Sequence, residues 1–417
     1  MKVLQINYSD AKGGAAKASY RLNNALKESG IDSSMLVLYK YLDDSSIILY
    51  KSDNKFYSRL IRNARKFKIN RLLNTVRKPD SGNYEIFSTH HSIYKDLANY
   101  TKNFDLVNLH WISGFLDFTS FFLNYPQNKS IVWTLHDMNP FTGGCHYDND
   151  CGKFEFKCGC CPQIGSKDNK DITNKAILAK YKVLKNRRND NLSFVSPSRW
   201  LKSQIDKSFL FGNYNTKVIP NGIDTNTFQP RDKVYSRKVL GLPIDKKIVL
   251  TGFYTLDAKR KGINSTQELF ANLNNNDIFL VSFGYGKINL NNRNYKHLGF
   301  IKDDIFLSIV YSAADLFLIT SIQDNLPNTV VESISCGTPV IGFDIGGIPE
   351  IIENDQNGIL IKNRNLKELE EKLISLLNNE AKLNALSINA RETALKNFDS
   401  KIQSENYFDF YKEILNK

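Results

Sequence analysis

The chain has 417 residues, of which 41% are hydrophobic and 24% are charged, and its formal net charge is +13. This length accommodates two domains with separate cores, and the composition is ordinary for a soluble globular protein. The sequence has no run of 18 apolar residues, which excludes a membrane span, and residues 1–7 are too short and too polar for a signal peptide. We therefore expect a cytoplasmic protein.

The N-terminal part of the chain predicts a βαβ unit. Residues 2–7 predict a short buried strand, residues 15–29 have helical periodicity, and residues 34–39 predict the next strand. Gly13 and Gly14 precede the helix. Glycines allow a ligand to approach the backbone closely, and a helix N-terminus favours an anion, although an ordinary tight turn has the same composition.

Positive charge is concentrated between residues 51 and 80, where Lys and Arg greatly outnumber Asp and Glu. The apolar positions on one side of a predicted helix in this segment are Phe56, Leu60, Ala64 and Phe67. Arg59, Arg62 and Lys66 lie on the opposite side. A solvated helix face and an amphipathic segment on an anionic membrane both fit this pattern. We expect no nucleic-acid binding, because no recognition module accompanies the charge.

Three later strands of the first half predict a parallel sheet with ligands at the carboxyl ends of its strands. They cover residues 106–109, 131–135 and 193–196. His110 follows the first of these strands and His136 the second. Each histidine is interpreted either as a ligand contact at a strand end or as a satisfied structural residue.

Five of the six cysteines lie between residues 145 and 161. In a reducing cytosol such a cluster favours a metal over disulfides, so we expect a structural zinc site with four thiolate ligands. Its expected ligands are Cys145, Cys151, Cys158 and Cys161. Cys160 and His146 are further candidate ligands, and reduced thiols or a disulfide are the alternatives.

A second α/β series follows residues 220–222, so we expect two doubly wound domains that join near residues 205–220. Its predicted strands cover residues 247–252, 278–283, 316–319 and 339–342. Predicted helices alternate with these strands, and long polar helices follow over residues 367–397.

The segment 324–340 carries the strongest functional signal. Asp324 and Glu332 stand eight residues apart, on either side of Pro327, which can begin a helix. A carboxylate before a helix N-terminus can bind sugar hydroxyls, the first backbone N–H groups can hold phosphate oxygens, and Glu332 can bind a vicinal diol. These features predict a nucleotide-sugar site.

The spacing of this acidic pair resembles the E-x7-E motif of retaining family-4 glycosyltransferases with the GT-B fold, with Asp in the first place. Four further segments resemble motifs of that family in the expected order: P-S-x-W/F, P-N-G-I/V-D-x-x-x-F, the end of R-x(4-5)-K-G, and G-G-x-P-E. They are residues 196–201, 218–228, 257–262 and 346–350. The Gly-Gly-Cys-His-Tyr run at 143–147 is similar to an insertion in a subgroup that builds bacterial surface polysaccharides.

This resemblance implies an α/β protein of the GT-B fold, with two doubly wound Rossmann-like domains facing an interdomain cleft. Residues 1–205 would form the acceptor-side domain, with a cysteine-rich insertion at 143–165. Residues 206–398 would form the nucleotide-sugar domain, and a helix over 399–417 would cross back to the first domain.

The resemblance also assigns roles to residues. Lys261 would bind the donor diphosphate, where a fixed cation offsets the charge of the leaving group. The expected catalytic residues are His136, Lys261 and Asp324. The expected donor-binding residues are Gly13, Gly14, Arg260, Lys261, Asn325, Leu326, Pro327, Asn328, Thr329, Val330 and Glu332. Phe253 departs from the family pattern, which often has Arg there, and Arg260 would supply the second cation.

The implied function is transfer of a hexose-type sugar, with retention, from a UDP- or GDP-sugar to a glycan or lipid-linked saccharide in synthesis of a surface polysaccharide such as capsule or lipopolysaccharide. The leaving diphosphate would take the acceptor's proton, so the residues act by positioning and electrostatics and need no catalytic cofactor. The basic segment would hold the enzyme on the inner face of the membrane. A catalytically silent sugar-nucleotide-binding or scaffold protein and an epimerase of the same fold are the alternatives.

Overall fold

The computed structural model describes residues 1–51, 60, 63–64, 66–68, 70–71, 88–185, 191–255, 259–273, 275–286, 288, 290 and 294–416. The chain divides into two compact units, Met1–Ile219 with Ser404–Lys417, and Pro220–Gln403. The boundary therefore falls after Ile219 and not after the expected residue 205. The reason is that β7 (Thr216–Val218) pairs with β6 (Leu192–Ser196) and completes the first sheet.

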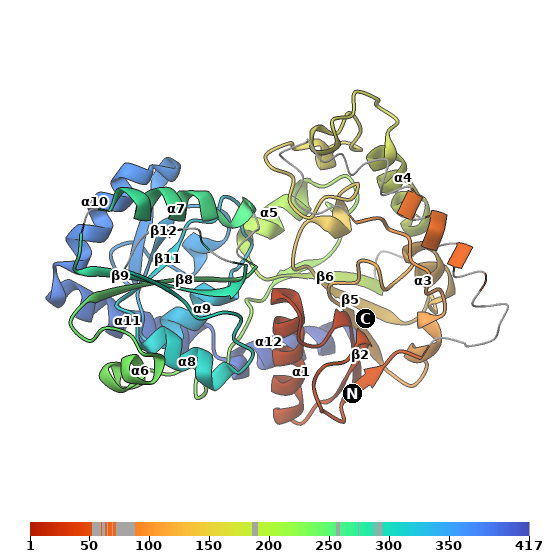
Figure 1. Cartoon of the computed structure of the whole chain (residues 1–417). Coiled ribbons are helices and arrows are strands. Elements are labelled where there is room, and N and C mark those ends of the chain that lie inside the picture. Colours follow the sequence, from red (N-terminus) through yellow and green to blue (C-terminus); the bar gives the residue numbers. More distant parts are fainter. Residues whose placement is uncertain are drawn as a thin grey trace. The chain divides into compact units, whose positions relative to one another are not determined.

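The first unit is built on a seven-stranded parallel sheet in the order β3-β2-β1-β4-β5-β6-β7 (Figure 1). The other strands are β1 (Lys2–Ser9), β2 (Asp32–Tyr39), β3 (Ile47–Leu49), β4 (Leu106–Leu109) and β5 (Ser130–Thr134). Its helices are α1 (Gly14–Glu28), η1 (Leu97–Thr101), α3 (Phe118–Asn124), η2 (Asn139–Phe141), η3 (Lys153–Glu155), η4 (Pro162–Ile164), α4 (Ile172–Leu184) and α5 (Arg199–Lys207).

Two clusters of buried side chains cover the two faces of this sheet, because neighbouring residues of a strand point in opposite directions. Ile131 and Trp133 of β5 belong to one cluster, and Val132 between them belongs to the other. Strands buried on both faces appear in the sequence as mostly apolar runs, which made β4, β5 and β6 predictable although each contains one or two polar residues.

The C-terminal helix α12 (Ser400–Leu415) contributes Tyr407 and Tyr411 to the second of these clusters. The Tyr407 hydroxyl lies 2.9 Å from Thr134 Oγ1, and the Tyr411 hydroxyl accepts a hydrogen bond of 2.9 Å from Asn108 Nδ2. These bonds satisfy polar groups that would otherwise be costly to bury. Residues from Ser404 onward thus belong to the first unit.

The second unit is built on a six-stranded parallel sheet in the order β10-β9-β8-β11-β12-β13. Its strands are β8 (Lys247–Thr255), β9 (Ile278–Tyr285), β10 (Tyr295–His297), β11 (Leu316–Ile319), β12 (Val340–Phe343) and β13 (Gly358–Ile361). Its helices are α6 (Lys233–Leu240), η6 (Lys259–Lys261), α7 (Ile263–Asn272), α8 (Asp304–Ser312), α9 (Asn328–Ser335), η7 (Ile348–Glu350), η8 (Lys362–Arg364), α10 (Leu366–Leu377) and α11 (Glu380–Asn397). Both units are doubly wound, as predicted.

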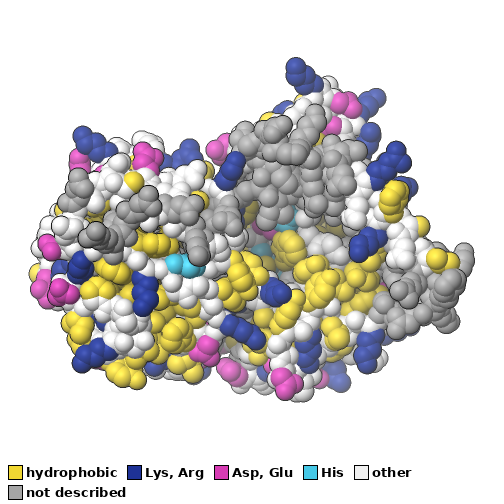
Figure 2. Space-filling model, in the orientation of Figure 1, with side chains coloured by type: hydrophobic (Ala, Val, Ile, Leu, Met, Phe, Trp, Pro, Cys, Tyr) yellow, Lys and Arg dark blue, Asp and Glu magenta, His cyan; other side chains and the backbone are white. Residues whose placement is uncertain are grey.

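The basic segment lies mostly outside the described residues, which exclude Arg59, Arg62 and Arg65. Leu60 and Phe67 are helical, with 51% and 71% of their surface exposed. On the face drawn in Figure 2, the Lys and Arg side chains in view are scattered over both units. None of the described helices is long and apolar enough to span a bilayer.

Candidate active site

Three segments of the second unit meet beyond the carboxyl ends of β8 and β11. They are η6, the loop at residues 320–327, and the turn at residues 346–347. Ile322 N donates to Arg260 O at 2.7 Å, and Gly347 N donates to Asp324 O at 3.1 Å. The K-G, acidic-pair and G-G-x-P-E motifs, which are far apart in the sequence, therefore form one site.

Asp324 is the centre of this site. Its Oδ1 lies 3.4 Å from Arg260 Nη1, and its Oδ2 is in direct contact with Lys261 Nζ. Burial raises the pKa of the Asp324 carboxyl, but the charges of Lys261 and Arg260 outweigh burial and hold this pKa below its ordinary value. At neutral pH the site thus contains one carboxylate between two cations. Phe253, in the place of the family's Arg, lies under Lys261, with Nζ 5.4 Å from the ring centroid.

Two glycines allow the segments to approach this closely. Gly262 has φ +70°, and a Cβ built on it would collide with the carbonyl oxygen of Thr320. Gly346 has φ +57°, and its Cβ would collide with the carbonyl oxygen of Asp324. Both positions require glycine for the left-handed backbone and for the close approach.

Helix α9 places Glu332 in the same part of the unit. Glu332 is 3% exposed, and its Oε2 accepts a 2.8 Å hydrogen bond from the hydroxyl of Tyr311. Tyr311 lies in α8, and its role was not predicted because nothing in the sequence links it to α9. Asn328 Oδ1 accepts a hydrogen bond of 3.2 Å from Asn221, so the P-N-G segment reaches the start of α9.

One expectation about α9 needs correction. Val330 was expected to offer its backbone N–H to a phosphate, but this N–H donates to Pro327 O at 3.0 Å, within the first turn. The Val330 and Leu326 side chains are buried in the core. Asn328 and Thr329 are half-buried, and Asn325 N donates to its neighbour Asp324 Oδ1 at 3.1 Å.

The glycines of the first unit lie where α1 begins. Gly13 caps the helix with φ +97°, a conformation that favours glycine, and Gly14 is the first helical residue. A Cβ on Gly13 would meet no atom within 4 Å. The glycine is therefore required by the backbone conformation and not by packing, and the space beside it is open.

The two strand-end histidines are joined to each other. His110 Nε2 lies 2.8 Å from Gln5 Oε1, and His110 Nδ1 lies 2.9 Å from His136 Nε2. Gln5 Nε2 points toward Ser33 Oγ at 3.4 Å, which orients the amide. These partners assign the protons: His110 donates from Nε2 to Gln5 and accepts at Nδ1 from His136 Nε2. His136 thus carries its proton on Nε2 and a lone pair on Nδ1. Gln5, a polar residue within an apolar strand, was overlooked at the sequence level.

This pair predicts a loss of stability in acid. Burial lowers the pKa of His136 to about 4 and that of His110 well below its ordinary value. The unfolded chain takes up these protons near pH 6.5, whereas the folded chain does not. The stabilisation by the neutral pair is therefore complete above about pH 6.5 and is lost as the pH falls toward 4, by up to about 1.4 kcal/mol per pH unit and histidine. The urea midpoint of unfolding, measured between pH 7 and 4.5, should fall less for His136→Gln than for the wild type. An equal fall in both proteins would show that His136 is not buried in its neutral form.

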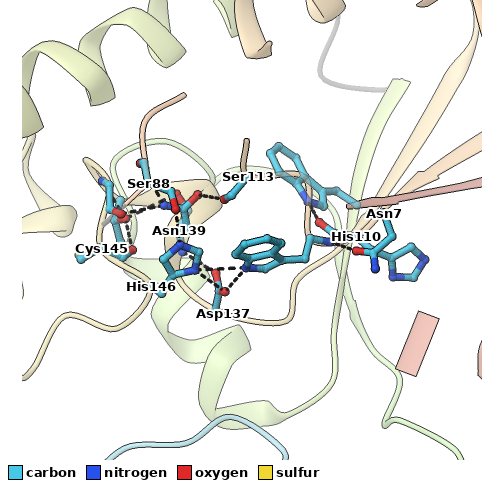
Figure 3. Close-up of polar contacts among 12 residues, drawn as sticks. Asn7, Ser88, His110, Ser113, Asp137, Asn139, Cys145 and His146 are labelled. Carbon is cyan, nitrogen blue, oxygen red and sulfur yellow. Dashed lines mark hydrogen bonds and ion pairs between the residues drawn. The ribbon is translucent and has the colours of Figure 1, made fainter. Parts of the chain in front are cut away.

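A second polar network links the cysteine-rich insertion to the end of β5 (Figure 3). Asp137 Oδ2 accepts hydrogen bonds from Trp111 Nε1 at 3.0 Å and from His146 Nδ1 at 2.6 Å. His146 Nε2 lies 2.8 Å from Ser88 Oγ. The charge and hydrogen bonds of His146 offset burial and lower the pKa of Asp137. His146 is thus held by Asp137 and Ser88, which the sequence did not indicate.

Four of the five clustered cysteines line one pocket of the first unit. These are the four expected zinc ligands, Cys145, Cys151, Cys158 and Cys161. All six cysteines are free thiols. Among the residues that the structure describes, no group of three or more His, Cys, Asp or Glu side chains is arranged to hold a metal ion.

Comparisons with known proteins agree with this geometry. Residues 236–393, which contain Lys261, Asp324 and Glu332, match the family model described as glycosyl transferases group 1. This part of the chain is therefore similar to the group 1 glycosyltransferases. WcaC of Escherichia coli (strain K12), named as a colanic acid biosynthesis glycosyl transferase, is 22% identical over 363 residues, which span 85% of each chain.

Solved structures share the fold of this chain. Sucrose-phosphate synthase from Thermosynechococcus elongatus aligns over 100% of this chain and 99% of its own, with a TM-score of 0.69 and 17% identity. HepE of Anabaena, solved in complex with UDP-glucose, aligns over 99% of this chain and 100% of its own, with a TM-score of 0.65 and 16% identity. The two Rossmann-like domains are thus those of GT-B glycosyltransferases, as expected.

Proposed function

We propose that this glycosyltransferase transfers a hexose-type sugar, with retention, from a UDP- or GDP-sugar to a glycan or lipid-linked saccharide in surface polysaccharide synthesis. The observation that carries the proposal is the cluster of Lys261, Arg260 and Asp324 in the unit that also carries the buried Glu332. Two cations, one sugar-binding carboxylate and one diol-binding carboxylate are the groups that a sugar nucleotide requires.

In this proposal, Lys261 and Arg260 offset the charge that builds on the departing diphosphate, and Asp324 binds hydroxyls of the transferred sugar. In the structure the Asp324 carboxylate offsets only one of the two positive charges, so the cluster keeps a net charge of +1. The diphosphate of the donor would replace Asp324 as the partner of the cations and leave its oxygens to accept from the sugar. Glu332, oriented by Tyr311, would bind the ribose hydroxyls. His136, at the end of β5, would contact the transferred sugar.

The relatives support the donor and acceptor classes. HepE was solved with UDP-glucose, and WcaC is named for colanic acid biosynthesis, a polysaccharide pathway. An acceptor of this kind that is linked to a lipid would require the reaction to occur at the inner face of the membrane, where the basic segment would bind anionic lipid. No catalytic cofactor is part of the proposal.

Calorimetry with UDP-, GDP-, ADP- and CMP-sugars, and with the matching nucleoside diphosphates, tests this assignment. Glu332→Ala should weaken binding of the free nucleoside diphosphate roughly thirtyfold, about 2 kcal/mol, because a charge-assisted contact is lost. Asp324→Ala should leave this affinity unchanged or tighter, because it frees Lys261 and Arg260, but should abolish discrimination between sugars. Glu353→Ala, which removes an exposed carboxylate of the same unit, is the matched control.

Equal affinity of the wild type and Glu332→Ala would remove Glu332 from the site. A collapse of nucleoside diphosphate binding in Asp324→Ala would show that Asp324 contacts the nucleotide. The second candidate function is that of a catalytically silent protein that binds sugar nucleotides. The contact between Lys261 and Asp324 favours it, because a cation that stays paired with Asp324 could not stabilise the leaving diphosphate. Binding of a donor without any release of nucleoside diphosphate would identify that case.

A further inference from the structure

The cysteine-rich insertion contains a site that the transferase reaction does not use. We propose that Cys145, Cys151, Cys158 and Cys161 bind one Zn²⁺ ion as a structural four-thiolate centre. The side chains of these residues line a single cavity of about 20 Å³, with space for roughly one ion or water-sized sphere. No other cysteine lines it.

The structure distinguishes these four residues from the two other candidate ligands. Cys160 Sγ contacts Lys167 O at 3.2 Å and Asn169 Oδ1 at 2.8 Å. His146 is held through both ring nitrogens, by Asp137 at 2.6 Å and by Ser88 at 2.8 Å. From the sequence, Cys160 and His146 were candidate ligands beside the four cysteines. Their contacts in the structure engage them elsewhere, so the four thiols of the cavity are the proposed ligands.

A buried cation lies near the same thiols. Lys180 is 3% exposed, and its Nζ donates to the carbonyl oxygens of Asn139, Pro140 and Thr142. Burial lowers the pKa of Lys180 to about 8, and the nearby Cys158, Cys145 and Asp137 partly oppose this shift. Four thiolates around one divalent ion leave a net negative charge, and a buried ammonium group offsets it.

The backbone of the insertion also needs a constraint. Asn149, Asp150, Cys158 and Cys160 all have left-handed φ values between 42° and 59°, which non-glycine residues rarely adopt. Such conformations persist only where the surroundings impose them. The segment from Cys145 to Cys161 has little regular structure apart from η3, so a metal cross-link is a physical reason for its shape.

Among the described residues, the sulfur atoms of the four thiols do not lie close enough together to coordinate one metal ion. Neutral thiols have no reason to converge, whereas a zinc ion draws four sulfurs to about 2.3 Å from itself, or roughly 3.8 Å from one another. On binding, the ion displaces the thiol protons to solvent, and no oxidant or reductant takes part.

Elemental analysis of protein purified without added metal tests the proposal. We expect about one zinc per chain in the wild type and in the matched control Cys160→Ser, and loss of the metal in Cys158→Ser. A strong chelator should lower the melting temperature of the wild type. Exchange of the ion for Co²⁺ should give the visible bands of a tetrahedral site and the near-ultraviolet bands of thiolate ligands, a result that does not require any variant to fold.

Four results would overturn the proposal. They are zinc-free protein with titratable thiols, equal loss of zinc in Cys160→Ser, iron with inorganic sulfide in place of zinc, and zinc that a weak chelator removes without change in melting temperature. The test is independent of the proposed transferase function, because none of its readouts uses a sugar nucleotide.

Discussion

Lys261→Ala is expected to slow release of nucleoside diphosphate from the preferred donor by about 100- to 1000-fold, the usual effect of removing one preorganised charge-stabilising group. Lys261 lies in η6, which the backbone hydrogen bond from Ile322 N to Arg260 O holds against the loop after β11. A cation fixed in this way needs no reorganisation when charge develops on the leaving phosphate. The rate constant at saturating donor is the quantity to compare.

The matched control is Lys259→Ala, which removes an exposed lysine of the same short helix. It should retain nearly the full rate. Because Lys261→Ala leaves Asp324 with one cation, the melting temperature of each variant should be recorded, and Lys261→Arg should recover part of the rate. An unchanged rate in a folded Lys261→Ala variant would contradict the role of this residue.

Gly262→Ala is expected to have the largest effect on stability. The substitution adds an unfavourable left-handed residue and a clash with the backbone of Thr320, which cannot move as a flexible side chain can. We expect a loss of about 2–5 kcal/mol, the sum of roughly 1–2 kcal/mol for the backbone and 1–3 kcal/mol for overpacking.

Gly241→Ala separates these two contributions. Gly241 has φ +59°, but its added Cβ would meet only Lys296 Nζ at 3.1 Å, the end of a flexible side chain. It should lose only the backbone contribution of about 1–2 kcal/mol. The urea midpoints of the two variants give the comparison, and equal midpoints would show that Gly262 is required for its φ alone.

The sequence predicted the two doubly wound sheets because their central strands are buried on both faces. Residues 316–319 are apolar at every position, and residues 131–135 are apolar at every position except Thr134; such runs indicate parallel strands. The boundary lies at the far end of the expected junction, after Ile219, because β7 is a three-residue strand of Thr216, Lys217 and Val218, too short and too polar to be recognised. Its pairing with β6 depends on tertiary structure.

The parts of the candidate site that could be predicted are those in which the residues of a motif themselves determine the local backbone conformation. Lys261, Gly262 and Asp324 lie together because a glycine permits the approach, and a glycine is visible in a sequence. The partners that orient the site were not predictable: Tyr311 reaches Glu332 from another helix, and Gln5 reaches His110 from another strand. Such pairs depend on which helices and strands pack next to one another in the fold, and a local sequence pattern does not indicate this packing.

Proton NMR of the purified protein with its preferred sugar nucleotide, in the absence of acceptor, tests the central claim most directly, since one spectrum reports both nucleoside diphosphate release and the anomer of the freed sugar. We predict that the nucleoside diphosphate appears together with free sugar whose first-formed anomer keeps the configuration of the donor, and that both signals are nearly absent with Lys261→Ala. A donor that is bound but stays intact, or a first-formed anomer of inverted configuration, would contradict the account.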